Sequence, residues 1–110
     1  MFSIISDTYS KFQAVHTLLN TTESTDSSYF AQLSEATQAA YIAMNEGMCI
    51  NTTVCHQCAE HRDFLQTMIV VLEELEEGEP LTQIYRDKII SYNLMVDETL
   101  KKISAILASL

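Results

Sequence analysis

Residues 54–110 read VCHQCAEHRDFLQTMIVVLEELEEGEPLTQIYRDKIISYNLMVDETLKKISAILASL, and this stretch decides the fold. One set of residues recurs at alternating steps of four and three, which is the spacing of one stripe along a helix: Val54, Cys58, His61, Leu65, Met68, Leu72 and Leu75. The same steps relate Tyr85, Ile89, Tyr92, Val96, Thr99, Ile103, Ile106 and Leu110. Gly78-Glu79-Pro80 separates the two stripes and breaks the helix. We therefore predict two long helices packed as an antiparallel hairpin.

The rest of the chain also favours an all-α fold. The 110 residues include two Gly, one Pro and no Trp, which leaves few residues for the many turns of a β protein. The chain has the length of one domain, so residues 1–110 are expected to share one core. The fold class predicted is all-α, an antiparallel four-helix bundle built on the long C-terminal hairpin. Its helices are expected at about 4–19, 29–46, 54–77 and 80–109.

The acidic balance of the chain limits its partners. The formal net charge is -9 at pH 7, and only six residues are Lys or Arg. Nucleic-acid surfaces need clustered basic side chains, and an anionic membrane repels an acidic protein. No apolar run is long enough to cross a bilayer, and residues 1–5 lack the basic start of a secretory signal. We expect a cytoplasmic protein whose partners include neither nucleic acid nor membrane.

Acidic residues are concentrated at the end of the third predicted helix. Five of the fifteen acids lie there: Glu73, Glu74, Glu76, Glu77 and Glu79. Carboxylates at a helix C-terminus oppose the helix dipole, by about 0.3–1 kcal/mol each at an exposed site. Either Glu77 and Glu79 serve the start of the fourth helix, with Pro80 in its first turn, or the run receives a basic partner. The simpler alternative is a solvated acidic corner.

A group of thiols and an imidazole is a candidate metal site. Cys49, Cys55, Cys58 and His61 could supply three thiolates and one imidazole to a tetrahedral zinc ion. Structural zinc sites usually draw their ligands from two separated pairs, whereas these four residues crowd into one segment. The alternative is that Cys58 and His61, which fall on the apolar stripe, pack in the core. Zinc is therefore one hypothesis for a cofactor, and the absence of any cofactor is the other.

No catalytic signature is evident in the sequence. Cys55-His56-Gln57-Cys58 matches Cys-x-x-Cys at a helix start, but the strand and helix order of a thioredoxin-like domain is missing. A carboxylate-bridged iron site would need Glu-x-x-His on two helices, and the chain has no such pair. We therefore expect a protein that is not an enzyme.

One short segment resembles a known family. The pattern Tyr85-x-x-Lys88-x-x-x-Tyr92-Asn93-Leu94 is similar to the start of the C-terminal helix of type III secretion needle and inner-rod subunits. Glu79-Pro80-Leu81 would then correspond to their proline-containing helical break. This resemblance implies a self-assembling secretion subunit. The acidic, helical layout with an apolar C-terminal helix also looks like small export chaperones such as the flagellar ones.

The function predicted is that of a small adaptor, chaperone or regulator. The long fourth helix has an apolar end, and an amphipathic partner helix lying in a groove is a common way to cover such a stripe. The apolar residues expected to bind the partner are Tyr92, Val96, Ile103, Leu107 and Leu110. Acidic steering is expected from Glu73, Glu74, Glu76 and Glu77. The competing prediction is that the same stripe is buried inside the monomer or in a homodimer.

Overall fold

The predicted all-α four-helix bundle is confirmed. The computed structural model describes residues 2–21, 26–46 and 52–109, with side chains described at 3–20, 26–45 and 61–109. These residues form helices and no strand. The helices are α1 (Phe2–Thr21), α2 (Ser27–Glu46), α3 (Thr52–Glu76) and α4 (Gln83–Ala108).

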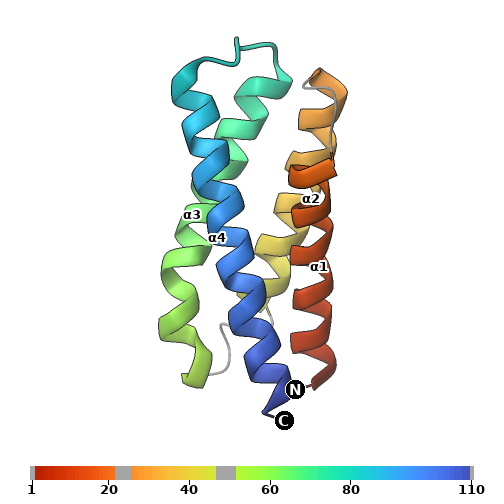
Figure 1. The fold of residues 1–110 in the computed structure, drawn as a ribbon, viewed down its shortest axis with the longest axis vertical. Coiled ribbons are helices and arrows are strands. Elements are labelled where there is room, and N and C mark those ends of the chain that lie inside the picture. Colours follow the sequence, from red (N-terminus) through yellow and green to blue (C-terminus); the bar gives the residue numbers. More distant parts are fainter. Residues whose placement is uncertain (1, 22–25, 47–51, 110) are drawn as a thin grey trace.

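The helices run up, down, up and down around one core. The two ends of the chain lie at the same end of the bundle, as Figure 1 shows. Helix α2 packs against α1 and α3, and α4 packs against α1 and α3, so each helix has two neighbours and faces the fourth across the core. The bundle measures 43 × 23 × 19 Å along its principal axes. The α3–α4 hairpin therefore forms one side of the four-helix bundle.

The break between α3 and α4 lies where the sequence predicts it, but α4 begins later than residue 80. Gly78 has φ +110°, the left-handed conformation that ends a helix, and the Glu79 N–H donates to the Glu74 carbonyl. Thr82 then caps α4, since its hydroxyl oxygen accepts from the Tyr85 N–H at 3.4 Å. Pro80 thus precedes the cap instead of occupying the first turn.

The core consists of the apolar stripes of all four helices. In α3 and α4 it follows the predicted spacing from Leu65 onward, although Met95 and Val71 join the stripes from adjacent positions. The largest side chains that are fully buried are Tyr92, Phe12, Ile5, Leu33, Met44, Leu65, Met68, Leu72 and Ile103. Since all four helices contribute, burial of one continuous core stabilises the bundle.

Three buried threonines connect the helices within this core. The hydroxyls of Thr8, Thr37 and Thr99 each donate to the carbonyl four residues earlier in their own helix. Each hydroxyl also meets a group on another helix. Thr8 contacts the Ala43 carbonyl at 3.5 Å. Thr37 contacts the Tyr92 hydroxyl at 2.7 Å, and Thr99 contacts His61 Nδ1 at 2.7 Å. These contacts join α1 to α2, α2 to α4 and α4 to α3.

Candidate functional site

Three of the five apolar residues predicted to bind a partner are buried in the monomer core. Tyr92, Val96 and Ile103 are buried, Leu107 is partly buried, and Leu110 lies outside the described residues. The stripe on α4 is covered because α1, α2 and α3 close around it. Tyr92, Val96 and Ile103 are thus buried inside the monomer, which is the competing prediction, whereas a partner contact at Leu107 and Leu110 stays a prediction.

Tyr92 illustrates how completely the stripe is enclosed. Its ring packs against Phe64 of α3, with ring centroids 6.1 Å apart, and its hydroxyl contacts Thr37 of α2. Burial raises the pKa of Tyr92 far above its usual value near 10, although a hydrogen bond from Thr37 to the ionised phenolate would act in the opposite direction. The phenol therefore stays neutral and serves packing rather than chemistry.

One of the five acids between Glu73 and Glu79 joins two helices, and the other four are exposed. The Tyr85 hydroxyl donates to Glu74 Oε2 at 2.6 Å, which joins α4 to α3. This hydrogen bond is the main reason that the pKa of Tyr85 is raised. The remaining acids are exposed, and we call them the acidic corner: Glu73, Glu76, Glu77 and Glu79. Of the predicted steering residues, Glu74 is therefore committed to holding the hairpin together.

An apolar groove opens at the end of the bundle where α1 ends and where α2 and α4 begin. Its volume is about 300 Å³. Its lining, which defines the apolar groove, is Leu19, Tyr29, Phe30, Leu81, Gln83, Arg86, Ile89 and Ile90. Ile90 is 58% exposed, and Leu94, one helical turn further along α4, is also mostly exposed. An apolar surface that the monomer leaves uncovered can receive a partner.

The acidic corner and the apolar groove lie at the same end of the molecule. The Ser27 hydroxyl donates to the Glu76 carbonyl at 2.8 Å, so the start of α2 is held beside the end of α3. Glu79 is also only two residues from Leu81 of the groove. Sequence reasoning missed the groove because Ile90 and Leu94 fall outside the apolar stripe of α4. Their four-residue spacing on the outer face was the available signal.

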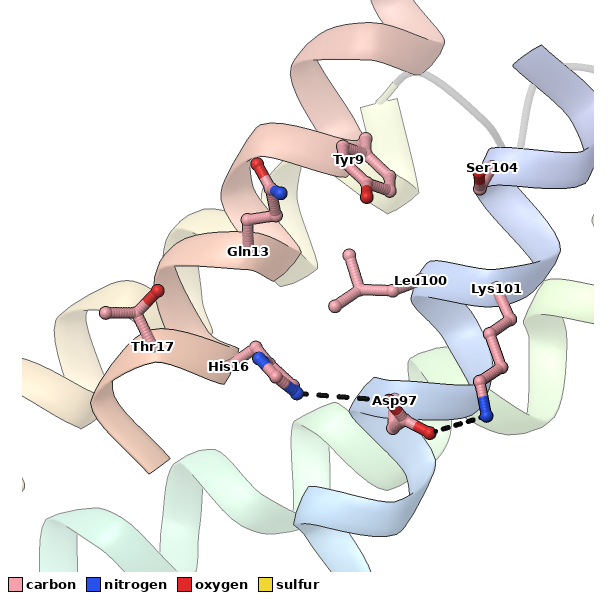
Figure 2. A pocket seen from close by; sticks show the side chains of 8 residues that line it. All are labelled: Tyr9, Gln13, His16, Thr17, Asp97, Leu100, Lys101 and Ser104. Atoms are coloured by element: carbon pink, nitrogen blue, oxygen red, sulfur yellow. Dashed lines mark ion pairs between the residues drawn. The ribbon is translucent and has the colours of Figure 1, made fainter. Parts of the chain in front are cut away.

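A second cleft lies between α1 and α4 (Figure 2). Its volume is about 430 Å³. Its lining, which defines the polar cleft, is Tyr9, Gln13, His16, Thr17, Asp97, Leu100, Lys101 and Ser104. Lys101 Nζ lies 3.0 Å from Asp97 Oδ2, and His16 Nε2 lies 3.9 Å from Asp97 Oδ1. The carboxylate of Asp97 is thus flanked by two basic side chains, one from each helix.

Most of the candidate zinc ligands lie beyond what the structure describes. Cys49 is outside the described residues, and the side chains of Cys55 and Cys58 in α3 are outside them as well. His61 Nδ1 lies 2.7 Å from the Thr99 hydroxyl of α4. That nitrogen is therefore engaged in the core. Within the described ranges no three His, Cys, Asp or Glu side chains gather as metal ligands, and the zinc site remains a prediction.

Comparisons with known proteins leave the function to be argued from geometry. No protein-family model, curated protein or solved structure matches this chain. The resemblances of residues 79–94 to secretion needle and rod subunits, and of the layout to export chaperones, therefore remain predictions. Among the described helices, none carries an apolar stretch long enough to span a membrane.

Proposed function

We propose that the protein is a non-enzymatic adaptor, acting in the cytoplasm, that holds an amphipathic helix of a partner protein in the apolar groove. The observation that carries this proposal is the exposure of Ile90 and Leu94 beside the half-buried Leu19, Leu81 and Ile89. A partner helix with apolar residues at i, i+3, i+4 and i+7 would cover this surface, which is the helix-in-groove mode of recognition.

The charge of the protein favours a basic partner over a second copy of the chain. Each copy carries a formal charge of -9, so two copies repel each other. The acidic corner stands beside the groove and would attract Lys or Arg flanking the apolar face of a partner helix. Such complementarity mainly speeds association and selects among partners, and salt weakens it.

A binding measurement with matched variants tests the proposal. The probe is a fluorescent synthetic amphipathic helix with Leu at the spacing above and Lys on its flanks. Ile90→Ser removes apolar surface from the groove, whereas Ile42→Ser removes it from α2 outside the groove. Both side chains are about half exposed, 58% for Ile90 and 51% for Ile42.

We expect Ile90→Ser to weaken binding about tenfold, since burying an Ile side chain contributes about 1.5–3 kcal/mol. Ile42→Ser should bind like the original protein. The proposal fails if the peptide does not bind, or if the two substitutions weaken binding equally.

A further inference from the structure

The polar cleft has the features of a second binding site, separate from the apolar groove. The two share no lining residue. Between them the Asn20 and Asn93 side chains exchange two amide hydrogen bonds of 3.0 and 3.1 Å, which join α1 to α4. We propose that the polar cleft binds a small, uncharged molecule rich in hydroxyl groups, of about the size of a monosaccharide.

The two helix faces that form the cleft are mostly polar. The lining residues recur on α1 at positions 9, 13, 16 and 17, and on α4 at 97, 100, 101 and 104, which is the spacing of one helical face. The cleft lies on the outer side of the α1–α4 pair, outside the apolar core, and Leu100 is the one aliphatic residue of its lining. Its volume of about 430 Å³ falls within the range of small-ligand sites, about 300–1,000 Å³.

The lining of the cleft carries no net formal charge. The ammonium of Lys101 lies 3.0 Å from the carboxylate of Asp97, so the one formal positive charge and the one formal negative charge compensate each other. An anion would have to displace Asp97 from Lys101, and a cation would have to displace Lys101 from Asp97. An uncharged ligand avoids both costs.

The lining of the cleft contains both donors and acceptors of hydrogen bonds. Asp97 is held between Lys101 and His16, and a carboxylate has lone pairs enough to accept from ligand hydroxyls as well. Gln13 and Ser104 add groups that both donate and accept. A polyhydroxyl ligand, in which every hydroxyl donates and accepts, matches this mixture.

The cleft also provides an apolar surface for the carbon skeleton of such a ligand. Leu100 projects from α4 into the space between Tyr9 and His16, as Figure 2 shows. The ring of Tyr9 and the methyl groups of Leu100 can cover C–H groups, while the polar ends of the neighbouring side chains meet the hydroxyls. The site therefore combines one apolar contact with several polar ones.

Titration of ¹⁵N-labelled protein with glucose and with myo-inositol, followed by NMR, tests the proposal. Inorganic phosphate serves as the anionic comparison. We expect saturable shifts confined to amides near residues 9–17 and 97–104. Asp97→Asn should weaken sugar binding at least about tenfold, since hydrogen bonds to charged groups contribute about 1.5–3 kcal/mol. Asp63→Asn, on an exposed site of α3, should change nothing.

A second variant separates loss of the site from loss of the fold. Ser104 is exposed, so Ser104→Trp fills the cleft with an indole without removing a core side chain. We expect this variant to unfold at the same temperature as the original protein and to bind neither sugar. The proposal is overturned if neither sugar shifts these amides, if the shifts scatter over the bundle, or if phosphate binds more tightly than the sugars.

Discussion

The hydroxyl of Tyr92 lies 2.7 Å from Oγ1 of Thr37, and both side chains are 0% exposed. Thr37 donates its only hydrogen to the Leu33 carbonyl at 2.7 Å, so Tyr92 must be the donor between the two hydroxyls. The bond joins α4 to α2 across the core. It explains why a tyrosine can be fully buried in this bundle, because its one donor is satisfied.

Removing the Thr37 hydroxyl and removing the Tyr92 hydroxyl should lower the free energy of unfolding by different amounts. Thr37→Val leaves the buried Tyr92 hydroxyl without an acceptor, which should lower the free energy of unfolding by about 1–3 kcal/mol. Tyr92→Phe leaves Thr37 still bonded to Leu33, so its cost should be smaller. Urea unfolding of both variants and of the double variant measures the coupling. Equal costs for the two single variants would contradict the assigned direction of the bond.

Tyr92 should also make the fold sensitive to alkali. Its pKa in the folded protein is raised above the usual 10.0, mainly by burial, so above pH 10 the unfolded chain loses a proton that the folded protein retains. The contribution of Tyr92 to the free energy of unfolding is therefore complete below pH 10. It falls as the pH rises above 10, by up to about 1.4 kcal/mol per pH unit. In Tyr92→Phe this part of the pH dependence should vanish. Unfolding in urea between pH 8 and 11 measures the difference, and parallel curves for the two proteins would refute it.

Glu74 should control the titration of Tyr85. The pKa of Tyr85 is raised first by its hydrogen bond to Glu74, then by burial and by the charges of Glu74 and Glu79. Glu74→Gln removes the charged acceptor and should lower the pKa of Tyr85. Glu73→Gln, at the exposed neighbouring position, should leave it unchanged. Ultraviolet absorbance of the tyrosinate during alkaline titration distinguishes the variants, with Tyr85→Phe identifying the signal.

Gly78 should be required because of its backbone conformation, and not because a larger side chain would clash with its surroundings. At φ +110° a side chain is strained, yet a Cβ atom added there would meet no other atom within 4 Å. Gly78→Ala should therefore lower the free energy of unfolding by about 1–2 kcal/mol, the usual cost of a left-handed conformation. Gly78→Asn should recover part of this loss, and Glu77→Ala serves as the control in the same turn. If Gly78→Ala is as stable as the original protein, the turn has a different conformation in solution.

The sequence predicts the fold better than the site because the two depend on different information. The stripe from Leu65 to Leu75 and the stripe through Tyr92, Val96 and Ile103 follow helical spacing, and both are buried. Periodicity identifies an apolar face but does not say what covers it. For that reason the spacing on α4 is compatible with a partner groove, although α1, α2 and α3 cover Tyr92, Val96 and Ile103 within the monomer.

Local sequence patterns likewise do not determine where α4 starts or which residues line the two clefts. Pro80 and Thr82 both carry helix-start signals, and only the backbone of the break shows that Thr82 is the cap. The apolar groove and the polar cleft bring residues 9–30 together with residues 81–104. The spacing of Ile90 and Leu94 indicates an apolar patch on α4, but no local pattern indicates which face of α1 meets which face of α4, so the lining of neither cleft could be predicted from the sequence.

The central claim, that the apolar groove receives a partner helix, is tested most directly by mapping where a helix binds. The measurement is an NMR titration of ¹⁵N-labelled protein with the basic amphipathic peptide. The account predicts saturable shifts at amides around Leu19, at 29–30 and at 81–90, with affinity that falls as salt is added. Shifts elsewhere on the bundle, or no shifts at any peptide concentration, would contradict it.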